Sequence, residues 1–129
     1  MSLDFVLKWY NRIPKPHRKL PLVIYKGKAY SPNKVLEEVK KGTPLGQELQ
    51  AALEAGKFTE EETYEKLAKI RLKMLLKNLP PEVGIATLSG KVYTRDELLK
   101  MIEEGKDAGR ELIELEKQII KRELRGENL

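Results

Sequence analysis

The sequence predicts a helix-rich α+β fold, in which two copies of a β-hairpin plus helix-turn-helix unit lie around a connecting helix with pseudo-two-fold symmetry. The first observation is an internal repeat: residues 83–120 align without gaps with residues 20–57, so that GKAYS at 27–31 is answered by GKVYT at 90–94. The second is a long apolar stretch at helical spacing between the copies, which is typical of a central helix.

The length and composition of the chain exclude several classes of protein. A chain of 129 residues is expected to form a single domain, and the absence of cysteine excludes disulfides and thiolate metal sites. Charged residues make up 35% of the chain, mostly Lys and Glu, which is typical of a thermophilic prokaryote. The N-terminal apolar run is interrupted by charges, and no run approaches the roughly 20 residues of a membrane span. We therefore expect a cytoplasmic protein without a signal peptide or a membrane partner.

The N-terminal segment, residues 1–19, is predicted to be a short helix over 3–12 followed by an extended basic linker over 14–19. Pro14 and Pro16 end the helix because proline lacks an amide donor and restricts the residue before it.

The first copy, residues 20–57, begins with strands at 22–25 and 28–30 around a Lys26-Gly27 turn. Ser31 is predicted to cap a helix that ends at Gly42, and Thr43 to cap a second helix. The predicted core positions of these two helices are Val35, Leu36, Val39, Leu45, Leu49, Ala52 and Leu53.

The connecting helix, residues 58–82, is predicted to start at a capping box of Thr59 and Glu62 and to stop at Pro80. Its apolar residues cover more than one face, so we expect it to be central and buried.

The second copy, residues 83–124, is predicted to have strands at 85–88 and 91–93 around Ser89-Gly90 and a capping box of Thr94 and Glu97. Gly105 should end the first helix and Asp107 should cap the second. The predicted core positions are Leu98, Leu99, Ile102, Ala108, Leu112, Leu115, Ile119 and Leu124. A lone hairpin is marginal in water, so the two hairpins are expected to join in one four-stranded sheet. Residues 125–129 should be a frayed tail.

Catalytic and metal-binding patterns are missing from the sequence. The chain has one histidine, His17, which lies in the basic linker with no acidic neighbour in sequence. No cluster of residues has metal-ligand spacing. We therefore predict a protein that is not an enzyme and has no cofactor, metal or small-molecule ligand. The repeated glycines at 42, 46, 105 and 109 fit close helix packing, or anion binding at a helix N-terminus.

Basic residues are concentrated at the front of the chain, where residues 1–19 carry five basic side chains and one acidic one. Cations interleaved with aromatics are typical of nucleic-acid binding, and the two hairpins add a repeated lysine next to tyrosine. The alternatives are a docking helix that buries Trp9, and hairpin lysines that protect strand edges. The candidate nucleic-acid- or anion-binding residues are Lys8, Trp9, Arg12, Lys15, Arg18, Lys19, Lys28 and Lys91.

A DNA-binding helix-turn-helix is disfavoured, because the second helix of the second copy is acidic and phosphates repel it. The leading hypothesis is a protein–protein interaction or assembly module, whose partner is another protein or a second copy in a homodimer. The alternative is nucleic-acid binding through the basic N-terminal segment and the duplicated hairpins.

Overall fold

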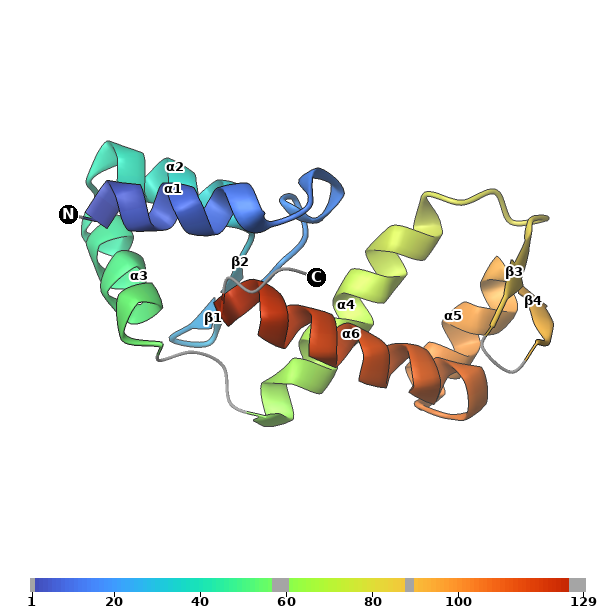
Figure 1. Ribbon diagram of the computed structural model, residues 1–129. Coiled ribbons are helices and arrows are strands. Elements are labelled where there is room, and N and C mark those ends of the chain that lie inside the picture. Colours follow the sequence, from blue (N-terminus) through green and yellow to red (C-terminus); the bar gives the residue numbers. More distant parts are fainter. Residues whose placement is uncertain (1, 57–60, 88–89, 126–129) are drawn as a thin grey trace. The chain divides into compact units, whose positions relative to one another are not determined.

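The computed structural model describes residues 2–56, 61–87 and 90–125, which divide into two compact units (Figure 1). Unit 1 comprises Met1–Tyr64 and Ile119–Leu129, and unit 2 comprises Glu65–Gln118. The described residues form six α-helices, one 3-10 helix and two antiparallel two-stranded sheets, so the helix-rich α+β class is confirmed. The internal duplication and the single domain stay predictions.

Unit 1 contains the first helices and the first hairpin. Its elements are α1 (Ser2–Arg12), the 3-10 helix η1 (Lys15–His17), β1 (Val23–Tyr25), β2 (Lys28–Tyr30), α2 (Pro32–Lys41) and α3 (Pro44–Ala55). The first residues of α4 (Glu61–Lys77) and the last turns of α6 (Asp107–Arg125) also belong to it. Helix α1 packs against α2 and α3. The core side chains are Val6, Trp9, Ile13, Leu20, Leu22, Val23, Val35, Leu49, Leu53, Ile120 and Leu124.

The linker after α1 is not extended, so that part of the prediction is wrong. The amides of His17, Arg18 and Leu20 donate to carbonyls three residues earlier, at 2.9, 3.2 and 3.0 Å. Proline is compatible with the first turn of a helix because its missing N–H would be unsatisfied there in any case. The turn folds the basic segment back onto unit 1, where the Arg18 carbonyl accepts the Asn33 amide at the start of α2.

The first hairpin has the predicted two-residue turn. Lys26 and Gly27 have φ values of 50° and 79°, as a type I′ turn requires. The register pairs Tyr25 with Lys28 and Val23 with Tyr30.

Helix α2 begins and ends as predicted, and α3 begins as predicted. The Ser31 and Thr43 hydroxyls accept the amides of Lys34 and Gly46, and Gly42 has φ 67°. A Cβ at Gly46 would overlap the Glu38 carbonyl, and a Cβ at Gly109 in α6 would overlap the Met101 carbonyl. Both glycines therefore permit close helix approach, which favours the packing interpretation over anion binding.

Unit 2 contains most of α4, the hairpin of β3 (Gly84–Ala86) and β4 (Val92–Thr94), α5 (Arg95–Glu104) and most of α6. The capping box of Thr94 and Glu97 is present, and Gly105 ends α5 with φ 67°. Asp107 is the first residue of α6, so its predicted role as the cap is wrong by one position. The core side chains are Leu67, Ala68, Leu72, Leu76, Leu98, Ile102, Ala108 and Ile113.

The second hairpin departs from the register of the first. Ile85 pairs with Tyr93, whereas the repeat offset would pair residue 86 with Tyr93. The Thr87 amide donates to the Lys91 carbonyl, and the Gly90 amide to the Thr87 carbonyl, both at 3.0 Å. This pattern encloses three residues and places Gly90 (φ 85°) at the position of a glycine bulge.

The predicted four-stranded sheet is wrong, because β1–β2 and β3–β4 form separate two-stranded sheets. The capping box at Thr59 and the turn residue Ser89 lie outside the described residues, as do residues 126–129 of the predicted tail.

We predict that Gly46→Ala lowers the free energy of unfolding by about 1–3 kcal/mol, because the added methyl group displaces the α2 backbone. Urea denaturation measures this change. The control is Gln47→Ala at the exposed neighbouring position, with an expected change within about 0.5 kcal/mol. Equal effects of the two variants would contradict close packing at Gly46.

Candidate interaction surfaces

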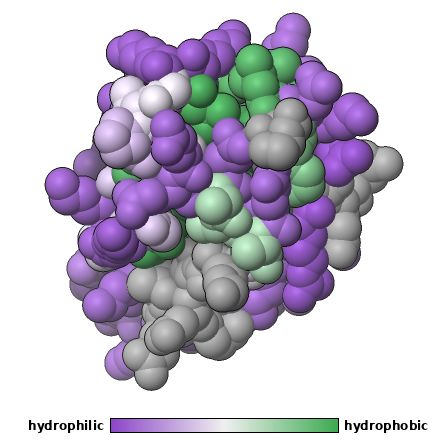
Figure 2. All heavy atoms as spheres, turned by 90° about the vertical axis from the view of Figure 1, so that its left-hand side faces the viewer, coloured by the Kyte–Doolittle hydropathy of each residue, from purple (hydrophilic) through white to green (hydrophobic). Residues whose placement is uncertain are grey.

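Some of the basic candidate residues are exposed, and others form contacts within unit 1. Lys8 and Arg12 lie one turn apart on α1, and Lys15 and Lys19 follow on and after η1. All four are exposed, and none forms an ion pair with a described residue. Figure 2 shows one face of the surface, where hydrophilic side chains surround several smaller hydrophobic groups.

Trp9 is buried in the core of unit 1 and is 3% exposed. Its Nε1 donates to the Glu123 carbonyl at 2.9 Å. An indole held in this way is not available to stack on a base, so the docking-helix alternative describes its position. This burial weighs against the prediction that Trp9 contributes to a nucleic-acid-binding site.

Arg18 is also engaged within unit 1. Its Nε donates to the Ile13 carbonyl at 3.0 Å, and its guanidinium lies 4.5 Å from the centroid of the Tyr10 ring. The Tyr10 hydroxyl in turn donates to Asn33 Oδ1 at 2.6 Å. These contacts fix the arginine and the tyrosine at the junction of α1, η1 and α2.

The two hairpin lysines, Lys28 and Lys91, are both exposed. They lie in different units, on hairpins of different register. Lys91 and Tyr93 line a shallow hollow with Asp107 and Glu111, which places two carboxylates beside that lysine.

His17 is positioned by a residue far away in sequence. Its Nδ1 lies 2.7 Å from Glu123 Oε2, and the Glu123 side chain is almost fully buried. Trp9 and His17 thus hold the backbone and the carboxylate of Glu123, which attaches the end of α6 to the N-terminal segment.

A second buried carboxylate lies in unit 2. Arg71 of α4 is fully buried, and its Nε lies 2.8 Å from Glu116 Oε2 of α6. Two opposite charges in a medium of low dielectric attract strongly, which offsets part of their desolvation cost.

These buried glutamates determine which side of α6 faces inward. Its buried positions are Ala108, Gly109, Ile113, Glu116, Ile120, Glu123 and Leu124. Leu115, predicted to be in the core, is 41% exposed. The prediction was wrong by about one residue because it assigned Glu116 to a solvated face.

Helix α4 is held from two sides within unit 2. Arg110 of α6 donates to Glu65 Oε1 at 2.7 Å, and this bond lowers the pKa of the Glu65 carboxyl. Lys73 pairs with Glu103 of α5 and lowers the pKa of that carboxyl in the same way.

The exposed face of α4 carries two apolar side chains, with the exposed Lys66 and Lys77 about one turn to either side of them. Ile70 and Met74 lie one turn apart and are 47% and 38% exposed, so the expectation of a fully buried α4 is wrong. Of the eight exposed large apolar side chains among the described residues, six belong to unit 2. They are Ile70, Met74, Leu79, Val83, Val92 and Leu115.

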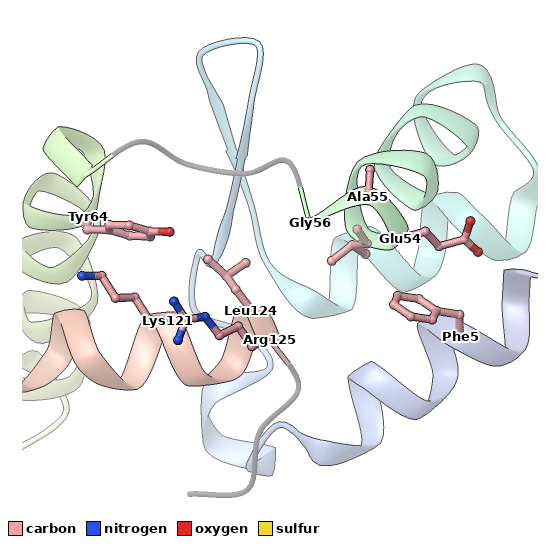
Figure 3. A pocket seen from close by; sticks show the side chains of 9 residues that line it. Phe5, Glu54, Ala55, Gly56, Tyr64, Lys121, Leu124 and Arg125 are labelled. Carbon is pink, nitrogen blue, oxygen red and sulfur yellow. The ribbon is translucent and has the colours of Figure 1, made fainter.

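A pocket of about 410 Å³ lies in unit 1 between α1, α3 and the ends of α4 and α6 (Figure 3). Phe5 and Leu124 line it together with Glu54, Lys121 and Arg125. The Lys121 ammonium lies 5.2 Å from the centroid of the Tyr64 ring. Charges of both signs line this pocket, so it does not select one class of ligand.

Comparison with protein-family models, curated proteins and solved structures gave no match. Within residues 2–56, 61–87 and 90–125, no group of three or more metal-ligating side chains is found, and no helix is long and apolar enough to cross a membrane.

Sequence reasoning missed the buried charges and the exposed apolar residues, although two signals pointed to them. Glu116 and Glu123 are seven residues apart, in phase with Ile113 and Ile120. Arg71 lies four residues after Leu67 in the densest apolar part of the connecting helix. A charge in phase with a core stripe is a candidate for a buried pair.

We predict that Glu116→Gln lowers the free energy of unfolding by about 3–5 kcal/mol, because it leaves the Arg71 charge buried beside a neutral amide. The control is Glu114→Gln at an exposed site on the same helix, with an expected loss below about 1 kcal/mol. Both are measured by urea denaturation. A double variant, Arg71→Met with Glu116→Leu, should recover most of the loss. A loss for Glu116→Gln no larger than the control would refute the buried pair.

Proposed function

We propose that this chain is a non-enzymatic assembly module that forms a homodimer through the apolar surface of unit 2. The observation that carries the proposal is the exposure of Ile70 and Met74 on the face of α4 that the other helices of the unit leave uncovered. The opposite side of α4 is buried in unit 2 through Leu67, Leu72 and Leu76, so this face stays outward.

Self-association is favoured by energetics as well as by exposure. Burying apolar surface contributes about 25 cal/mol per Å², and contiguous exposed apolar patches mark interaction sites. Unit 2 exposes four more large apolar side chains, Leu79, Val83, Val92 and Leu115.

The assembly is tested by light scattering after size-exclusion chromatography over a range of concentrations. The chain should approach twice its own mass as concentration rises. Replacing Ile70 and Met74 together by glutamate should weaken the dimer at least tenfold, because two hydrophobic contacts become buried charges. The control is Gln47→Glu, which adds a negative charge at an exposed position of α3 in unit 1. A wild-type chain that stays monomeric would contradict the proposed function.

A second candidate function is the binding of a polyanion such as nucleic acid. Its support is a set of exposed cations that form no ion pair with any residue that the structure describes: Lys8, Arg12, Lys15 and Lys19. Because Trp9 is buried, such binding would depend on phosphate contacts and would be insensitive to base sequence.

The candidate is tested by fluorescence anisotropy with labelled DNA and RNA at several salt concentrations. If these lysines contact phosphates, Lys15→Ala with Lys19→Ala should reduce the slope of log affinity against log salt by roughly 1.4–1.8. The control pair is Lys40→Ala with Lys100→Ala, at exposed positions of α2 and α5. The absence of binding at low salt would eliminate this candidate.

A further inference from the structure

We infer that two copies of the chain pair through their β3 strands, which form a four-stranded antiparallel sheet across a two-fold axis. This inference rests on the proposed homodimer and names the edge at which the second copy binds.

The backbone geometry identifies the open edge of β3. The Thr87 amide bonds to the Lys91 carbonyl, so Thr87 belongs to a hydrogen-bonded pair of the β3–β4 ladder. Such pairs alternate along an antiparallel ladder, and Ile85 opposite Tyr93 is therefore the next one. The amides and carbonyls of Gly84 and Ala86 consequently point away from β4. The described part of unit 2 contains no third strand to bind them.

The chemistry of this edge favours a second copy. Residues 83–87 (VGIAT) carry no charge and no proline. A charged side chain or a proline on an edge strand is among the features that protect it from pairing with another chain. The outer edge of β4 differs, because Lys91 and Arg95 flank it and two such edges would repel each other. An uncharged strand is compatible with itself, as an interface between identical surfaces requires.

A specific register follows. With the axis at Ile85, Gly84 of each copy lies opposite Ala86 of the other. These two pairs exchange four hydrogen bonds through the groups that point outward. Gly84 and Ala86 are small and exposed, and Val92 beside Ala86 is 65% exposed. The joined sheet would therefore present a continuous uncharged face.

The first hairpin lacks these features. Val23 of β1 is buried in the core of unit 1, whereas Ala86, the residue at the same place in the repeat, is exposed. The side chain at this place in the first hairpin is thus covered by its own unit, whereas the corresponding side chain in the second hairpin is accessible.

The test is Ala86→Pro, which removes the outward amide and keeps the ladder bonds of Ile85 and Thr87. Proline is tolerated at an edge position whose amide faces solvent, so the monomer should stay folded, as circular dichroism can check. The dimer dissociation constant, measured by sedimentation equilibrium, should rise about tenfold or more because two hydrogen bonds are lost per dimer. The matched control Ala86→Val keeps the amide and should leave the dimer intact.

Two further readouts keep the outcomes distinct. The variant Ala86→Lys keeps the amide but adds a charge to the edge, so it should also weaken the dimer. If the proline variant does not fold, the lysine variant takes its place in the test. Hydrogen exchange at the Gly84 and Ala86 amides should slow as concentration rises. A dimer that is unaffected by Ala86→Pro and Ala86→Lys would overturn β3 pairing but leave the proposed function standing. A wild-type monomer at all concentrations would overturn both.

Discussion

The burial of two carboxylates on one face of α6 constrains the rest of the structure. Glu116 and Glu123 are seven residues apart, which is close to two helical turns, so both point to the same side. Each carboxylate has a basic partner close by, Arg71 in unit 2 and His17 in unit 1. Because a buried charge without its partner is costly, the helix cannot rotate away from this orientation.

The orientation of α6 determines which of its side chains are exposed at the surface. In unit 2 it keeps Leu115 exposed, and the buried Leu67 and Leu72 of α4 leave Ile70 outward. In unit 1 the Glu123 carbonyl of the same helix accepts the Trp9 indole N–H, so this aromatic ring is not exposed beside the basic side chains. Most of the exposed large apolar residues thus lie in unit 2, whereas the exposed cations that form no ion pair with a described residue lie in unit 1, and the two groups support two different functions.

The features that could be predicted from sequence are those with local causes. Caps at Ser31, Thr43 and Thr94 and left-handed glycines at the helix ends each depend on a few neighbouring residues. The features that were missed depend on partners far away in sequence. The inward side of α6 requires knowledge of Arg71, whereas the burial of Trp9 was one of the two alternatives that the sequence left open. The hairpin register changed because a three-residue turn replaced the two-residue turn that the repeat implied.

The orientation of α6 can be measured directly, because the chain has no cysteine of its own. Single-cysteine variants Leu115→Cys and Ile113→Cys would be labelled with a thiol reagent under native conditions, and the rates compared with those of the unfolded chain. The buried carboxylates require fast labelling at position 115 and strong protection at position 113. Protection at 115 with fast labelling at 113 would contradict the account, since α6 would then bury its apolar stripe and expose Glu116.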